Sequence, residues 1–222
     1  MAGSKIYAVK KGLSTGLYNS WEECKAVVEG FPGAEYKSFK SRQEAMQYLG
    51  MVCEDAKQIP KQDVPKEGNL IAYVDGSYEH SLQKYAFGCV FLLPNGSVLT
   101  EKGSGNNPDS AKLRNVTGEM LGAMFAVKWA MKNGFQNIEI CYDYEGIEKW
   151  VSGAWKSKTD LTMKYALAMR DWQNEIHMTF TKVEAHTNVY YNEMADNLAK
   201  SALVDTDGIP PVKVAAEMEA VE

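Results

Sequence analysis

Acidic residues at four points of the chain have the character of ligands for a divalent metal ion. Asp75 and Asp143 each follow an apolar run rich in β-branched and aromatic residues. Two aspartates that end neighbouring strands would lie side by side and offer the oxygen ligands that Mg²⁺ and Mn²⁺ prefer. Glu119 and Asp196 fall in segments of helical pattern and could close the cluster from the side. Because clustered carboxylates repel one another unless a cation neutralises them, their convergence predicts a metal site suited to phosphodiester chemistry.

The elements expected to position these acids form an α/β unit. Apolar and alternating runs predict strands at residues 70–75, 85–92, 97–102, 138–142 and 177–184, and helical patterns predict helices at 116–133, 144–152, 161–175 and 191–203. Residues 94–96, Pro-Asn-Gly, are typical of a hairpin turn. Strands that alternate with helices in this way predict a mixed sheet with helices on both faces.

A smaller unit precedes it. Strands are expected at residues 5–11 and 35–39, with a turn at 12–16. Capping boxes that begin at Ser20 and Ser41 predict two helices, which end near residues 29 and 49.

Shifts in composition divide the chain into four parts. We expect an N-terminal domain at residues 1–50, a flexible linker at 51–68, a second domain at 69–205 and an acidic flexible tail at 206–222. The linker carries Pro60 and Pro65 among polar residues, and the tail contains Gly-Ile-Pro-Pro before an acidic end.

Composition restricts the function classes further. The 222 residues carry a formal charge of −5, but residues 1–50 hold seven Lys/Arg against five Asp/Glu, so positive charge collects in the first domain. No apolar stretch approaches the roughly 20 residues of a membrane span, and the first residues lack the apolar core of a signal peptide. We therefore expect a cytoplasmic protein without a membrane partner. The four cysteines have no CxxC spacing and are expected to be reduced thiols.

The contexts of the four acids resemble, in order, the four signatures of type 1 ribonuclease H. The matching segments are Tyr-Val-Asp-Gly-Ser at 73–77, Arg-Asn-Val-Thr-Gly-Glu at 114–119, Tyr-Asp-Tyr at 142–144, and Ala-His-Thr at 185–187 followed by residues 192–200. An ordered match of four motifs is more specific than one short motif. The resemblance covers about residues 69–203 and implies a ribonuclease H-like mixed five-stranded sheet.

The resemblance also implies an activity. Asp75, Glu119, Asp143 and Asp196 would bind two Mg²⁺ ions, with Mn²⁺ as a substitute, and the enzyme would hydrolyse the RNA strand of RNA/DNA hybrids to leave 3′-hydroxyl and 5′-phosphate ends. His186 would assist proton transfer or product release.

Two further residues of this segment would contact the substrate by resemblance. Asn115 would read ribose 2′-hydroxyls, and Arg114 would meet a phosphate of the DNA strand. Trp150 and Trp155 are candidates either for a DNA-strand channel or for the core.

Residues 4–49 resemble the hybrid-binding domain that precedes the nuclease in many type 1 ribonucleases H. By that resemblance Tyr7, Trp21 and Tyr36 contact the hybrid, with the rings of Trp21 and Tyr36 on deoxyribose faces where a 2′-hydroxyl would obstruct them. Lys37 would lie near a phosphate, whereas Ser38 replaces a lysine common in the family. The alternative for Trp21 is that its ring covers a small core.

Three other readings of the chain are open. A DEDD-type exonuclease would need an acid two residues after Asp75, where this chain has Ser77. A fragment of a retroviral-type polymerase would need polymerase sequence, and a non-catalytic hybrid-binding protein would not need all four acids. No obligatory protein partner is evident, so we expect a monomer that binds RNA/DNA hybrids.

Overall fold

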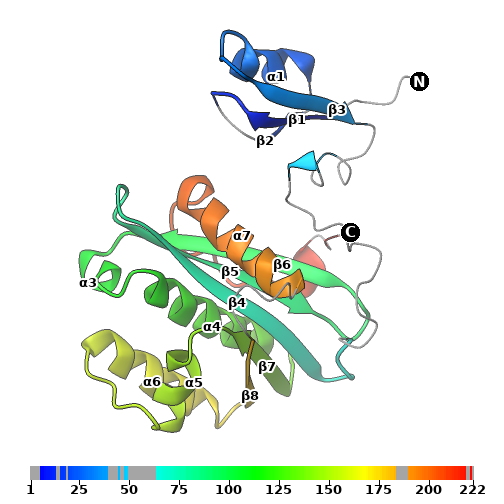
Figure 1. The fold of residues 1–222 in the computed structure, drawn as a ribbon. Helices are drawn as coiled ribbons and strands as arrows, with labels where there is room; N and C mark the ends of the chain where they lie inside the picture. The colour runs from blue at the N-terminus through cyan, green and yellow to red at the C-terminus, as the bar shows by residue number, and fades with distance from the viewer. Residues whose placement is uncertain are drawn as a thin grey trace. The chain divides into compact units, whose positions relative to one another are not determined.

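The computed structural model describes residues 6–13, 16–18, 20–39, 45, 48–49, 64–183, 190–218 and 221. The chain forms two compact units, Met1–Lys61 and Gln62–Glu222 (Figure 1). Most of the expected linker lies outside the described residues, and the expected boundaries at residues 50 and 68 stay predictions.

The first unit is a three-stranded antiparallel sheet with a helix. Its described elements are β1 (Ile6–Lys11), β2 (Gly16–Tyr18), α1 (Trp21–Val28) and β3 (Glu35–Phe39). The strand order is β2-β1-β3, and Cys24 and Val28 of α1 bury Val9 of the central strand. The Ser20 hydroxyl accepts a hydrogen bond from the Glu23 backbone N–H at 3.2 Å, as its capping position predicts.

Strand β2 was not predicted, because its first residue falls in the expected turn. The helix expected from Ser41 falls mostly outside the described residues.

The second unit is a five-stranded mixed sheet flanked by helices. Its elements are β4 (Asn69–Glu79), β5 (Lys84–Leu92), β6 (Val98–Gly105), α3 (Pro108–Ala111), α4 (Asn115–Lys132), β7 (Asn137–Tyr142), α5 (Gly146–Ser152), α6 (Asp160–Trp172), β8 (His177–Lys182), α7 (Tyr190–Asp205) and the short 3₁₀ helix η1 (Ala215–Glu217). The strand order is β6-β5-β4-β7-β8; β4, β5 and β6 are antiparallel, while β7 and β8 run parallel to β4. The predicted fold class is confirmed.

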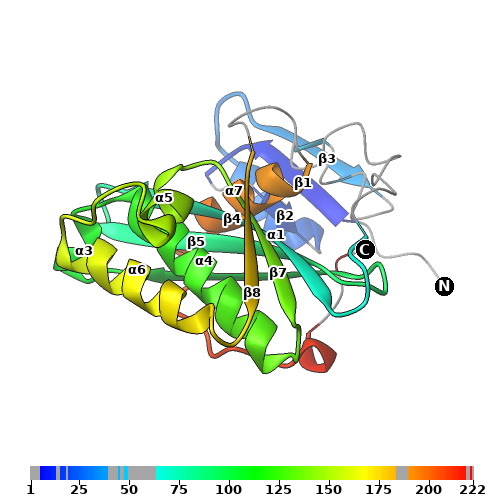
Figure 2. The same cartoon turned by 90° about the horizontal axis from the view of Figure 1, so that it is seen from below.

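The two faces of this sheet carry different helices. Helices α4, α5 and α6 lie on one face and α7 on the other (Figure 2). Alternate residues of β4 serve the two faces, because successive side chains of a strand point to opposite sides. Val74 packs in the core beneath α4, with Trp129 of that helix completely buried, whereas Tyr73 packs against Tyr191 of α7.

Strand β4 is longer than the sequence predicts. We expected Asp75 to end this strand, but the strand continues through Gly76 to Glu79, paired with β5 along its length. Asp75 is therefore a residue within a strand. By contrast, Asp143 does follow the last residue of β7, as predicted.

The expected flexible tail was wrong for the described residues after Asp205. The Gly208 carbonyl accepts a hydrogen bond from the Ser104 backbone N–H at 3.0 Å, and the Val221 N–H donates to the Val98 carbonyl at 2.7 Å. Between these points Met218 accepts a hydrogen bond from the Trp129 indole at 3.2 Å. The segment crosses the outer edge of β6 and covers apolar surface of α4, which composition alone does not reveal.

Among the described residues, no helix is long and apolar enough to cross a membrane. Cys24, Cys89 and Cys141 are buried, and Cys53 lies outside the described residues.

Candidate active site

Three of the four predicted ligands converge. Asp75, Glu119 and Asp143 each contribute one carboxylate oxygen, and these oxygens lie within 4.8 Å of one another. They come from β4, from α4 and from the residue after β7. Strands β4 and β7 are parallel neighbours, with Tyr73 opposite Cys141. Asp75 and Asp143, each two residues further along, therefore lie next to each other.

Glycines bring Glu119 within reach of β4. A Cβ atom at Gly118 would lie 2.0 Å from the Ala86 carbonyl oxygen, so α4 approaches the sheet at a distance that only glycine permits. Its backbone nearly touches Gly76, the residue after Asp75. The close contact between α4 and β4 therefore brings the carboxylate of Glu119 next to that of Asp75.

Asp196 approaches from the other face. Helix α7 packs on β5 at Gly88, where a Cβ atom would lie 2.2 Å from the Ala195 carbonyl oxygen. Asp196 is not among the three converging acids, and its carboxylate accepts a hydrogen bond from Lys200 at 2.6 Å. Its charge nevertheless contributes to raising the pKa of Asp75.

The converging carboxylates are electrostatically strained. Burial, together with the charge of Asp143, raises the pKa of Asp75 to about 7. Burial raises the pKa of Glu119 to about 9, with the charges of Asp143 and Asp75 adding to the effect. The Oε2 atom of Glu119 is buried and has no hydrogen-bond partner among the described residues. A buried acceptor without a donor is costly.

These observations fit a divalent cation. Buried and half-buried carboxylate oxygens that face one another, one of them with no donor among the described residues, are suited to Mg²⁺ or Mn²⁺. A cation there would offset both the repulsion and the unsatisfied oxygen.

The residues before Glu119 form an exposed corner. Arg114 and Asn115 are exposed at the start of α4, and Arg114 has φ 55° and ψ −128°, a conformation that non-glycine residues rarely adopt. Strained backbone of this kind collects at functional sites.

An aromatic cluster follows Asp143. Trp150 is 9% exposed and packs against Tyr144 and Tyr165, while Trp155 is 39% exposed and contacts the same tryptophan edge-on. Trp150 is therefore mainly a core residue, and Trp155 presents its ring to solvent.

Three predicted contacts of the first unit lie in a row. The Trp21 ring centre is 5.6 Å from that of Tyr7 and 5.8 Å from that of Tyr36. Trp21 and Tyr36 are 39% and 43% exposed, so Trp21 does not simply cover a core. Lys37 is not part of this row, since its ammonium group lies over the Phe39 ring.

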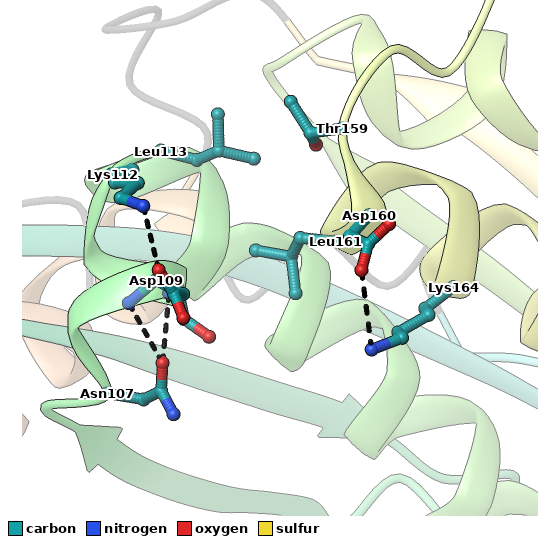
Figure 3. Close-up of a pocket in the computed structure, with 9 residues that line it drawn as sticks. Asn107, Asp109, Lys112, Leu113, Thr159, Asp160, Leu161 and Lys164 are labelled. Carbon is teal, nitrogen blue, oxygen red and sulfur yellow. Dashed lines mark hydrogen bonds and ion pairs between the residues drawn. The ribbon is translucent and has the colours of Figure 1, made fainter.

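A separate cleft of about 620 Å³ lies between α3 and the start of α6. Leu113 and Leu161 point into it from opposite walls (Figure 3). Lys112 on one wall is paired with Asp109, so its charge is already balanced. The cleft was not predicted and does not include the converging acids.

His186 lies outside the described residues. Gly88 and Lys200 were not predicted as site residues. A lysine four residues after Asp196 is a recognisable helical pairing, whereas nothing local marks Gly88 as a contact with α7.

The chain resembles known proteins in both units. Residues 73–202 match the family described as reverse transcriptase-like, and residues 5–49 match the ribonuclease H1 N-terminal domain. Ribonuclease H of Saccharomyces cerevisiae is 54% identical over 45 residues, which are 20% of this chain and only 13% of the yeast protein. Ribonuclease H1 of Rattus norvegicus is 23% identical over 260 residues, which cover 91% of this chain and 90% of the rat protein.

A solved structure agrees with the second unit. RNase H1 from the archaeon Halobacterium salinarum superposes with a TM-score of 0.51 and 26% identity over 62% of this chain and 99% of the archaeal chain. Together with the family match over residues 73–202, this shows that the chain belongs to the type 1 ribonuclease H family of enzymes and carries the N-terminal domain found in ribonuclease H1.

Proposed function

We propose that the protein is an endonuclease that hydrolyses the RNA strand of RNA/DNA hybrids by two-metal-ion catalysis and leaves 3′-hydroxyl and 5′-phosphate ends. The observation that carries the proposal is the convergence of Asp75, Glu119 and Asp143 within 4.8 Å, with a buried oxygen of Glu119 that receives no hydrogen bond from the part of the chain that the structure describes. The ribonuclease H names of its relatives support the substrate class.

The three converging acids and Asp196 would hold Mg²⁺. When bound, Mg²⁺ supplies a Lewis acid that polarises the scissile phosphate and lowers the pKa of water. Asp75 is central, because its carboxylate faces those of Glu119 and Asp143 and its pKa is also raised by the charge of Asp196. Asp196, with its side chain one-third exposed, completes the set from the solvent side. We assign proton transfer or product release to His186.

Contacts with the hybrid would come from two places, the start of α4 and the first unit. Asn115, exposed four residues before Glu119, would hydrogen-bond ribose 2′-hydroxyls, and Arg114 beside it would meet a phosphate. In the first unit, Tyr7, Trp21 and Tyr36 present rings suited to sugar faces, and Lys37 supplies positive charge. Residues 1–50 would then keep the nuclease near its substrate and raise the number of cuts per encounter.

The experiment is cleavage of an end-labelled RNA/DNA hybrid by the full chain, with Mg²⁺ and with a chelator instead. Duplex RNA and duplex DNA of the same sequence serve as controls. We expect cleavage of the hybrid's RNA strand only, and only with the metal. Binding of the hybrid without any cleavage would favour a non-catalytic hybrid-binding protein and overturn the proposal.

A further inference from the structure

One row of residues across the sheet connects the acid cluster with helix α7. Asp75, Gly88 and Lys102 lie directly opposite one another on β4, β5 and β6. Gly88 and Lys102 both meet α7, since a Cβ atom at Gly88 would lie 2.8 Å from the Ala199 backbone nitrogen. The row thus carries a candidate ligand, a close helix contact and a lysine.

Lys102 binds the last turn of α7. Its ammonium group donates to the Ser201 hydroxyl at 2.8 Å and to the Asp205 carboxylate at 2.8 Å. The Lys102 side chain is 28% exposed, so its stem is packed between strand and helix. This lysine links the outer strand of the sheet to the helix that carries Asp196.

Lys84 binds the residues that follow the helix. Its side chain is 14% exposed, and its ammonium group donates to the Thr206 carbonyl and pairs with Asp207 at 3.1 Å. The Ser104 hydroxyl donates to the same carbonyl at 2.8 Å. The last turn of α7 contains no basic residue of its own, so strands β5 and β6 supply the cations that favour a helix C-terminus.

We propose that Lys84 and Lys102 form a lysine clamp that fixes the end of α7 on the sheet and thereby positions Asp196 beside Asp75. Apolar side chains already pack α7 on the sheet: Tyr191 and Ala195 cluster with Tyr73, and Ala202 and Leu203 cluster with Ala86. The pairing of Asp196 with Lys200 lies within α7 and cannot fix the helix to the sheet. To the apolar contacts the clamp adds hydrogen bonds and ion pairs, which are directional, at the end of α7. Lys84 and Lys102 are positioning residues, and the inference rests on the proposed metal site.

The test uses the full chain with Lys84→Met, Lys102→Met and the double substitution, because methionine keeps the length of the apolar stem. Mg²⁺ binding is measured by calorimetry without hybrid, well below the unfolding temperature. We expect the half-saturating Mg²⁺ concentration to rise about tenfold in the double variant, as for other residues that orient metal ligands. Lys102→Arg should restore most of the affinity. Lys66→Met, on an exposed residue before β4, is the matched control.

Amide hydrogen exchange of the metal-free proteins provides a second readout. The clamp variants should exchange faster in α7 than the wild type, while exchange in α4 and α6 stays unchanged. A lower unfolding temperature with unaltered Mg²⁺ affinity or unaltered α7 exchange would overturn the inference and leave the lysines a purely structural role. If the double variant does not fold, Mg²⁺ affinity and amide exchange in α7 are measured for the single variants and for Lys102→Arg, and these results decide whether the clamp exists. Failure of the wild type to bind Mg²⁺ would refute the proposed metal site, and exchange would then decide the clamp alone.

Discussion

Gly76 and Glu119 are in direct backbone contact: a Cβ atom at Gly76 would lie 2.3 Å from the Glu119 backbone nitrogen and 2.9 Å from its Cγ atom. Gly76, which follows the candidate ligand Asp75, is thus in contact with Glu119, the next candidate ligand along the chain. The short distance between Asp75 and Glu119 requires glycine at position 76, because a Cβ atom there would collide with Glu119.

Gly76→Ala should push the start of α4 away from β4. We expect a loss of about 1–3 kcal/mol in the free energy of unfolding, as for other overpacked positions, and a marked loss of Mg²⁺ affinity. Urea unfolding and calorimetry measure the two effects. Gly122→Ala in the same helix is the control, because its Cβ atom would meet Phe87 and Val74 at an acceptable 3.4 Å. Equal effects of both substitutions would contradict this account.

Asp143→Asn should abolish cleavage and leave hybrid binding nearly intact. The substitution removes one anionic ligand, whereas binding of the hybrid depends mainly on contacts with its backbone and groove. Cleavage assays with Mg²⁺ and binding titrations with a chelator provide the two measurements. Wild-type turnover by the purified variant would remove Asp143 from the site.

The stability of the metal-free protein should fall as pH rises. The raised pKa values of Asp75, about 7, and Glu119, about 9, mean that the folded state binds these protons more tightly than the unfolded chain. Their stabilising effect is complete below the unfolded pKa values of about 4 and disappears as pH rises through the folded ones.

Urea unfolding from about pH 4 to about pH 9, with a chelator and with Mg²⁺, tests this dependence. Mg²⁺ should remove most of the decline, and its binding should release protons, which calorimetry detects in buffers of different ionisation enthalpy. A Glu119→Gln variant should show a shallower decline without metal. A flat profile for the metal-free wild type would show that these carboxylates are not strained.

Trp21→Ala should weaken binding of the hybrid without changing the rate of cleavage at saturating hybrid. Loss of a ring that stacks on a nucleotide costs about 1–3 kcal/mol, and Trp21 belongs to the first unit, away from the acids in sequence. Fluorescence anisotropy and single-turnover cleavage separate the two quantities. Leu13→Ala, on a side chain that is 72% exposed in the same unit, is the control. Unchanged affinity would indicate that the aromatic row does not bind substrate.

Lys213→Met should destabilise the second unit. Lys213 pairs at 3.2 Å with Glu101, a carboxylate that is only 8% exposed. Leaving this buried acid without its partner should cost about 1–3 kcal/mol, whereas Glu101→Gln in the same background should recover part of the loss. Thermal unfolding of the two single variants and the double variant measures this coupling. Additive effects would show that the pair contributes nothing.

The fold and the elements that carry the three converging acids could be predicted because they have local signals. Apolar runs mark β4 and β7, and the helical pattern marks α4, so the elements that carry Asp75, Asp143 and Glu119 were found. The contacts between distant residues could not be read in the same way. Gly88 against Ala195, and Trp129 against Met218, join residues that no periodicity connects. Gly-Ile-Pro-Pro after α7 is typical of an unstructured end. The segment nevertheless packs, because α4 presents an apolar surface that it covers.

The four acids lie, in chain order, on β4, on α4, at the end of β7 and on α7. This order matters while the protein is being synthesised. A nascent chain that reaches only to α6 already contains Asp75, Glu119 and Asp143, but Asp196 has not yet been added, and Tyr73 and Val90 still lack the helix that covers them. The fourth acid and the side chains that cover Tyr73 and Val90 therefore arrive together, on the same helix. Covering of this face of the sheet and assembly of the four acids become a single event, so an unfinished chain lacks the complete set of acids that the proposed cleavage requires.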